Sequence, residues 1–204
     1  MKTTIFLLST SLLLMGCMKE ELLPSSALEG GTWKTGCSYS GSNSTYQINT
    51  ASFSGGNFTQ SMTVYGSSSC ASSLIKIDNT GTYLVGDKLA TSDSIELDMT
   101  LGSMNLTPLD ATLVTNYNAA TYCGYSDWSL GVAKSVAGRT CDTSTMAPVG
   151  TVQYDIYYIA PYSIPQLNVV QGTLNFGYFD STHDGTTPAK RPEATWGNFD
   201  YIRQ

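Results

Sequence analysis

Apolar and polar residues alternate through several stretches of this chain, a pattern typical of strands with one buried face. Residues 56–66 show it clearly, because Phe58, Gln60, Met62 and Val64 fall on one side while threonine, serine and tyrosine fall on the other. Each such stretch predicts a strand that packs its apolar side against a core. The same alternation runs through residues 92–106, 149–160, 166–179 and 198–203.

A turn signal interrupts the pattern between residues 72–78 and 82–90. The sequence Asp78-Asn79-Thr80-Gly81 combines residue types that favour tight turns, and the stretches on either side of it are suited to strands. We therefore expect a β-hairpin here, with its turn at these four residues.

One segment follows a helical period instead. Thr107 is a suitable N-cap, and the apolar residues Leu109, Leu113 and Tyr117 recur every four positions along one stripe. This predicts a single helix over residues 108–118. The rest reads as about eight to ten short strands, a number typical of a closed antiparallel barrel or a sandwich.

The N-terminus resembles the export signal of a bacterial lipoprotein. Lys2 precedes about a dozen mostly apolar positions, too few for the roughly 20 residues that span a bilayer as a helix. Leu14-Met15-Gly16-Cys17 resembles the lipobox, where cleavage precedes the cysteine and its sulfur carries a diacylglycerol. The expected organisation is a signal peptide (1–16), a lipidated cysteine with its tether (17–29) and one domain (30–204).

Lipidation of Cys17 would make the membrane a partner of the protein, because two acyl chains already anchor a protein stably where one does not. The residue that follows is Met18. In enterobacterial lipoproteins an aspartate at that place is the inner-membrane retention signal. Its absence favours the outer membrane as the localisation.

Composition narrows the classes of partner. The chain has 16 acidic and 10 basic residues, a net charge of −6, which argues against nucleic acid and against a polybasic contact with anionic lipid. Charged residues make up only 13% of the chain. The strands are therefore expected to build their polar faces from hydroxyl side chains, as exported β-proteins do.

Four cysteines remain when Cys17 is set aside, and an even number in an exported chain suggests two disulfides with three alternative connectivities. We favour Cys37–Cys70 and Cys123–Cys141, because each pair lies within one block of sequence. Each loop would contribute roughly 3–4 kcal/mol in the chain-entropy model. The alternative is a four-cysteine metal site, but the close CxxC spacing of such sites is missing, so we expect no metal.

The segment Gly31-Thr32-Trp33 resembles the Gly-x-Trp motif of lipocalins, whose tryptophan lies on the first strand and packs at the closed end of the barrel. Further positions, over roughly residues 28–90, resemble the lipocalin-like domain of the family named after the adenomatosis polyposis coli down-regulated protein, a membrane-anchored inhibitor of Wnt signalling. The order that carries this resemblance is Trp33, Cys37, Val64-Tyr65, Cys70 and Gly81-x-Tyr83-x-x-Gly86.

The resemblance implies an all-β fold, a lipocalin-like antiparallel β-barrel with one short helix, whose interior holds a lipid or another apolar group. Trp33 would plug the closed end, with Arg139 or Arg191 as the arginine that packs over it. Aromatic residues of two C-terminal strands either form cross-strand pairs or line the cavity. The candidate lining residues are Tyr154, Ile156, Tyr158, Phe176 and Tyr178.

Catalytic chemistry has little support in the sequence. His183, with Asp180 and Asp184, lies in a Gly/Thr/Pro-rich stretch that reads as a surface loop, and Ser126 lacks the setting of a nucleophile. We expect no catalytic residues and no cofactor. The leading hypothesis is an outer-membrane lipoprotein that binds or carries a small apolar ligand. The alternative is a non-enzymatic envelope protein with a filled barrel, whose protein partner the sequence does not identify.

Overall fold

The computed structural model describes residues 27–40, 44–164, 169–197 and 199–204, and within them eight antiparallel strands close into a barrel. The pairing of the first strand with the third completes the circle. In spatial order the strands are β1 (Thr32–Thr35), β12 (Tyr201–Arg203), β11 (Val169–Phe176), β10 (Val152–Ile164), β6 (Ile95–Pro108), β5 (Ser73–Lys88), β4 (Asn57–Tyr65) and β3 (Tyr46–Ser54).

The predicted fold class, an all-β barrel with one short helix, is confirmed. The α-helix α2 (Ala111–Ala120) is the only one that lies wholly within the described residues. Four further strands lie outside the circle: β2 (Ser38–Tyr39), β7 (Lys134–Ser135), β8 (Thr140–Cys141) and β9 (Ser144–Thr145). Two short 3₁₀ helices span Tyr122–Gly124 and Pro188–Lys190.

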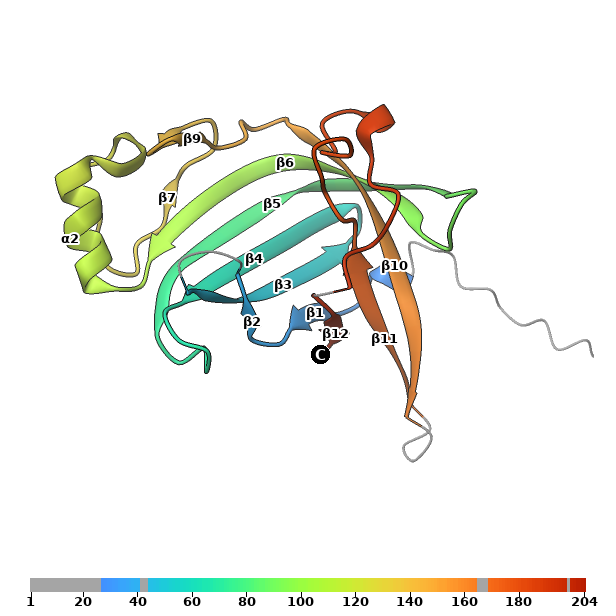
Figure 1. Ribbon diagram of the computed structural model, residues 1–204. Helices are drawn as coiled ribbons and strands as arrows, with labels where there is room; N and C mark the ends of the chain where they lie inside the picture. Colours follow the sequence, from blue (N-terminus) through green and yellow to red (C-terminus); the bar gives the residue numbers. More distant parts are fainter. Residues whose placement is uncertain (1–26, 41–43, 165–168, 198) are drawn as a thin grey trace, which may run out of the picture.

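The circle of eight strands is complete at one end of the barrel, and at the other end the wall flares. Strand β10 pairs with residues 95–100 of β6, whereas residues 105–106 pair with the short β7. Likewise, β1 pairs with residues 50–52 of β3, whereas residues 46–47 pair with β2. Strands β3 to β6 therefore extend beyond the circle as a curved sheet that reaches toward α2 (Figure 1).

The predicted hairpin at residues 78–81 is wrong, because β5 runs unbroken through this segment. Thr80 and Gly81 pair with Ser103 and Leu101, so a β-bulge with Gly102 of β6 as the extra residue lies opposite this segment. A Cβ atom at position 81 would lie 2.0 Å from the carbonyl oxygen of Thr100 and 2.7 Å from the ring of Phe58. The glycine thus permits a close approach between two long strands and does not form a turn.

The predicted start of the helix is also wrong. Thr107 and Pro108 are the last residues of β6 and pair with β5. The residues predicted as the N-cap and the first helical position therefore belong to a strand. The N-cap is Asp110, whose side chain accepts a hydrogen bond of 2.9 Å from the backbone N–H of Leu113. The helix ends beyond the predicted Asn118, at Ala120.

Two clusters of buried side chains fill the ends of the structure. The first cluster, at the closed end, is built around Trp33, Phe53 and Tyr157. The second lies beneath α2 and is built around Leu106 and Trp128. Leu28 is fully buried in the first cluster, so the barrel domain begins inside the stretch assigned to the tether.

Trp33 occupies the position that the lipocalin resemblance implies, on the first strand and with 1% of its surface exposed. Its indole N–H donates a 2.9 Å hydrogen bond to the carbonyl of Leu28. The arginine over its ring is Arg203, at 4.6 Å from the ring centre, and neither Arg139 nor Arg191. This arginine comes from β12, the strand that pairs directly with β1.

Both favoured disulfides are present. Cys37–Cys70 links the residue before β2 to the connection between β4 and β5, and Cys123–Cys141 links the 3₁₀ helix after α2 to β8. Cys17, the expected lipidation site, lies outside the described residues. In the described segments, every helix is too short or too polar to cross a bilayer.

Candidate ligand-binding cavity

Three adjoining hollows lie in the interior of the barrel, between the two core clusters. The methionine hollow has a volume of about 150 Å³, the central hollow about 170 Å³ and the aromatic hollow about 250 Å³. Gln60 and Asn79 line both the methionine and the central hollow. Asn49 and Tyr201 line both the central and the aromatic hollow. Shared lining residues therefore place the three hollows next to one another.

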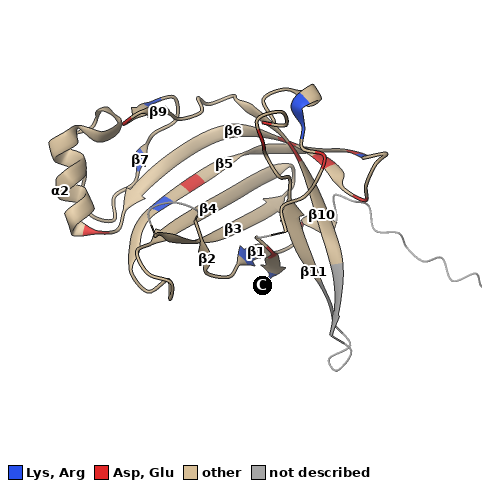
Figure 2. Cartoon of the chain, in the orientation of Figure 1, with Lys and Arg blue, Asp and Glu red and all other residues tan. Residues whose placement is uncertain are grey.

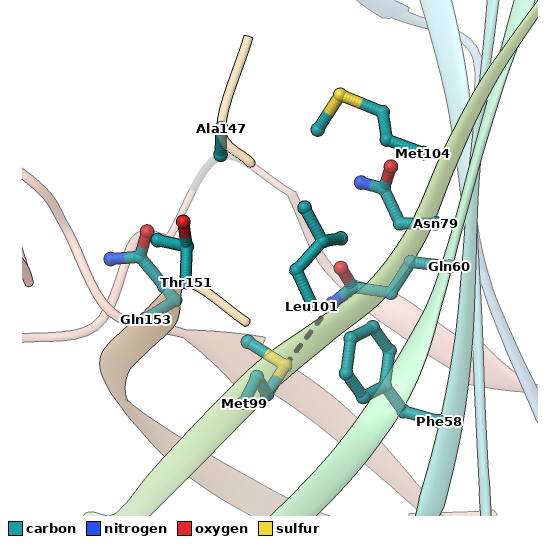
Figure 3. A pocket seen from close by; sticks show the side chains of 9 residues that line it. All are labelled: Phe58, Gln60, Asn79, Met99, Leu101, Met104, Ala147, Thr151 and Gln153. Carbon is teal, nitrogen blue, oxygen red and sulfur yellow. Dashed lines mark hydrogen bonds between the residues drawn. The ribbon is translucent and has the colours of Figure 1, made fainter. Parts of the chain in front are cut away.

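The methionine hollow is formed where β4, β5 and β6 face the chain that leads into β10 (Figure 3). Gln60 donates a long hydrogen bond of 3.6 Å from Nε2 to the sulfur of Met99. Ala147, Thr151 and Gln153 lie across the hollow from these strands. The remaining lining residues are Phe58, Asn79, Leu101 and Met104.

The central hollow lies over the inner faces of β3, β4 and β5. Met62 and Ile77 supply its apolar surface, and Asn49, Gln60 and Asn79 supply carboxamides. These side chains come from positions that pair across strands or lie two residues apart along one strand, so the alternation of each strand places them together. Its other lining residues are Thr50, Ser61 and Tyr201.

The aromatic hollow has two unlike walls. Gln47 and Asn49 of β3 form one wall. The other is formed by residues of β11, of β12 and of the segment between them. These residues are Phe176, Gly177, Trp196, Phe199 and Tyr201. The ring of Trp196 packs edge-on against Tyr178, with ring centres 5.0 Å apart, and in a tilted arrangement against Phe199, with ring centres 5.6 Å apart.

No aspartate, glutamate, lysine, arginine or histidine lines these three hollows among the described residues. Charged residues are sparse on the barrel strands in general and gather on connections and strand ends (Figure 2). Burial, and the nearby carboxyl of Asp155, also raise the pKa of the Tyr201 phenol, which therefore stays neutral. The walls are thus uncharged but rich in hydrogen-bonding groups.

Two buried polar atoms in these walls have no hydrogen-bond partner among the described residues. They are the carboxamide oxygen of Asn79, an acceptor, and the indole N–H of Trp196, a donor. Leaving such an atom unpaired costs about 1–3 kcal/mol. The side chains that carry these two atoms belong to the walls of neighbouring hollows, which therefore hold both an unpaired acceptor and an unpaired donor.

Of the five predicted lining residues, Phe176 alone contacts a hollow. The inner face of β10 carries Gln153, Asp155 and Tyr157. Their partners on β6 belong to the first cluster or pack against it, which shows that this face points inward. These partners are, in the same order, Met99, Leu97 and Ile95. Tyr154, Ile156 and Tyr158 occupy the alternate positions, on the outer face. Tyr178 is exposed and packs against Trp196.

The outer face of β10 is buried too, which explains why alternation misled the prediction. Arg191, from the segment after β11, donates a 2.7 Å hydrogen bond to the carbonyl of Asp155 and lies over the ring of Tyr154. The same guanidinium forms ion pairs with Glu96 at 3.5 Å and Asp98 at 2.7 Å, on the outside of the barrel. Both carboxylates are therefore held on the outside of the barrel, away from the cavity.

Asp155 is a buried carboxyl on the inner face of β10. One of its oxygens accepts hydrogen bonds from the backbone N–H groups of Ile156 at 2.7 Å and Gly177 at 2.9 Å. Burial raises its pKa to about 7, against the opposing effects of these donors and of Arg191. The carboxyl ties β10 to the end of β11 and does not line any of the three hollows.

His183 lies in a surface loop, as the sequence predicts. Its Nδ1 is 3.4 Å from Asp180, and its Nε2 is 3.8 Å from the exposed Glu193. Asp184 is engaged by Thr186 and by Lys190, at 2.6 Å and 3.0 Å. Within the described segments, no three His, Cys, Asp or Glu side chains are arranged to hold a metal ion.

The sequence pattern missed most of the cavity. Gln60 was the available signal, since it is the one polar residue on the otherwise apolar side of its stretch. Asn79 was missed because the sequence predicted that it lies in a turn. Nothing in the local pattern singled out Asn49 or Trp196. No family model matches this chain, and no curated protein matches it.

Proposed function

We propose that this protein is a lipid-anchored, non-enzymatic binding protein of the bacterial outer membrane, which holds one small molecule inside a lipocalin-like barrel. The observation that carries the binding function is the set of three adjoining hollows between the two filled core clusters. Ligand sites are typically clefts of roughly 300–1,000 Å³, and the hollows reach that range only together. The occupant we propose therefore spans all three.

The anchor and the family rest on the sequence. The lipobox-like segment ending at Cys17 supports lipidation, and the Gly-x-Trp motif supports kinship with lipocalin-like domains. Arg203 strengthens the second argument, because an arginine over the first-strand tryptophan is what the resemblance implies. The absence of catalysis is proposed because the charged groups described above, apart from the buried Asp155, lie on loops or on the outside of the barrel.

Native mass spectrometry of the full-length protein, released from its own membranes in mild detergent, tests the binding function. Wild-type protein should carry one small molecule per chain in addition to the mass of the anchor. Gln60→Trp places a large ring between the methionine and central hollows and should abolish this increment. The matched control is Thr59→Trp, on the exposed face of the same strand.

Two outcomes would overturn this proposal. If wild-type protein and Gln60→Trp both carry nothing, the barrel is a filled structural or interaction module. If the increment survives in Gln60→Trp, the molecule is bound somewhere else. For the anchor, Cys17→Ala should remove the acyl mass and release the protein from the membrane fraction, and retention of both would refute lipidation.

A further inference from the structure

The chemistry of the cavity walls restricts the ligand more narrowly than the barrel fold does. An ionised carboxylate or phosphate placed in these hollows would find no lysine, arginine or histidine among the described lining residues. Burying such a charge without a partner is costly. Fatty acids and phospholipid headgroups are therefore poor candidates, and an organic cation lacks a carboxylate partner in the same way.

A purely apolar ligand is disfavoured as well. Five carboxamides line the hollows: Gln47, Asn49, Gln60, Asn79 and Gln153. Each carboxamide carries both a donor and an acceptor group. Gln60 and Gln153 already donate hydrogen bonds within the protein, but a hydrocarbon chain would pair with none of the remaining amide groups, and covering a polar group without pairing it is unfavourable.

The unpartnered atoms indicate what the ligand must offer. Asn79 Oδ1 lacks a donor and Trp196 Nε1 lacks an acceptor, and the central hollow lies next to both the hollow lined by Asn79 and the hollow lined by Trp196. A hydroxyl group both donates and accepts. The aromatic wall of Phe176, Phe199 and Tyr201 in turn offers flat apolar surface, whose burial requires an apolar face on the same molecule.

From these observations we infer that the ligand is an uncharged sugar, a molecule whose hydroxyls pair with the carboxamides while its C–H face packs on the aromatic wall. The inference rests on the binding function proposed above and names the ligand class for the same cavity. The two walls of the aromatic hollow, amide on β3 and aromatic opposite, match the two kinds of surface that a sugar ring presents.

The test uses the full-length protein, purified in a zwitterionic detergent so that no sugar headgroup competes. The protein is applied to an array of immobilised neutral and acidic glycans, and the strongest ligands are then titrated in solution. Palmitate and monoolein serve as a charged and an uncharged lipid probe. We expect binding to neutral glycans and at least tenfold weaker binding to acidic glycans of the same length.

Variants locate the site. Asn79→Leu should weaken glycan binding at least tenfold, whereas Asn105→Leu, on the opposite face of the sheet, should leave it unchanged. Trp196→Phe keeps an aromatic ring at this position and removes the indole N–H donor. The other two tryptophans, Trp33 and Trp128, are buried outside the hollows, so the fluorescence change on ligand addition should disappear in Trp196→Phe.

The outcomes separate the two levels of the proposal. Binding of palmitate or monoolein without glycan binding would overturn the sugar assignment and leave the binding function standing. Binding of acidic glycans alone, or equal loss in Asn79→Leu and Asn105→Leu, would also overturn it. If no probe binds and the native protein carries no small molecule, the binding function itself fails.

Discussion

Replacing Asp155 by asparagine should remove a pH dependence of stability that this carboxyl imposes on the barrel. Burial raises its pKa from 3.8 to about 7, so folding favours the protonated form. Between these two pH values the unfolded chain has released the proton and the folded chain still holds it. The free energy of unfolding must therefore fall as pH rises from about 4 to about 7, and level off above.

The size of the effect follows from the shift. Each pKa unit corresponds to about 1.4 kcal/mol, so a shift from 3.8 to about 7 gives on the order of 4 kcal/mol over the whole range. Asparagine retains an oxygen that can accept from Ile156 and Gly177, but it carries no charge. Asp155→Asn should therefore match the wild type near pH 4 and exceed its stability near pH 8.

Urea denaturation at intervals between pH 4 and pH 8, with the disulfides intact, measures this difference directly. The control is Asp93→Asn. Lys88 lowers the pKa of that exposed carboxyl, so its contribution changes only below pH 4 and the difference from wild type should be flat. A difference for Asp155→Asn that is flat over the same range, or that favours the wild type at high pH, would refute the reasoning.

Three further substitutions probe the architecture, each followed by urea denaturation. Gly81→Ala should cost roughly 3 kcal/mol, because the added Cβ would lie 2.0 Å from a backbone oxygen. The control is Gly36→Ala, whose Cβ would meet nothing within 4 Å and should change stability little. Equal effects of the two substitutions would contradict the close approach at the bulge. Arg203→Met should cost about 2–4 kcal/mol, because it removes the contact with the Trp33 ring and the hydrogen bonds to the carbonyls of residues 27 and 29. The control is Lys34→Met, at an exposed position of β1, which should cost under about 0.5 kcal/mol. Removing the 123–141 disulfide with paired serines should cost about 3 kcal/mol, and an unchanged midpoint would show that the second cluster does not need it.

Strand content could be predicted because it depends on alternation, which is local. The same pattern fitted a barrel or a sandwich, and the choice of a barrel came from the resemblance to lipocalin-like domains. The face shared by Phe58, Gln60 and Met62 is an example, since the sequence alone placed these residues together and the structure keeps Phe58 and Gln60 in one wall. The disulfides were predictable for the same reason, because each pair lies within a short stretch. Features fixed by one stretch of chain are visible in its residues.

The errors occurred where a distant segment decides the outcome. Gly81 and Asn79 looked like a turn because only the approach of β6 shows that the glycine serves a bulge. Thr107 looked like an N-cap because only its pairing with β5 shows that the strand continues. Tyr154 and Ile156 looked inward because they are more apolar than Gln153 and Asp155, and only the segment carrying Arg191 shows that both faces of β10 are covered.

The contact of Arg203 with the N-terminal side of the barrel has a consequence for biogenesis. The guanidinium and the carbonyl of Ala27 that it binds are 176 positions apart in the chain. A polypeptide is synthesised from its N-terminus, so Trp33 has no arginine over its ring until the chain has been made as far as Arg203. Closure of the barrel base over Trp33 therefore comes late in folding, because it depends on contacts between residues that are remote in the sequence.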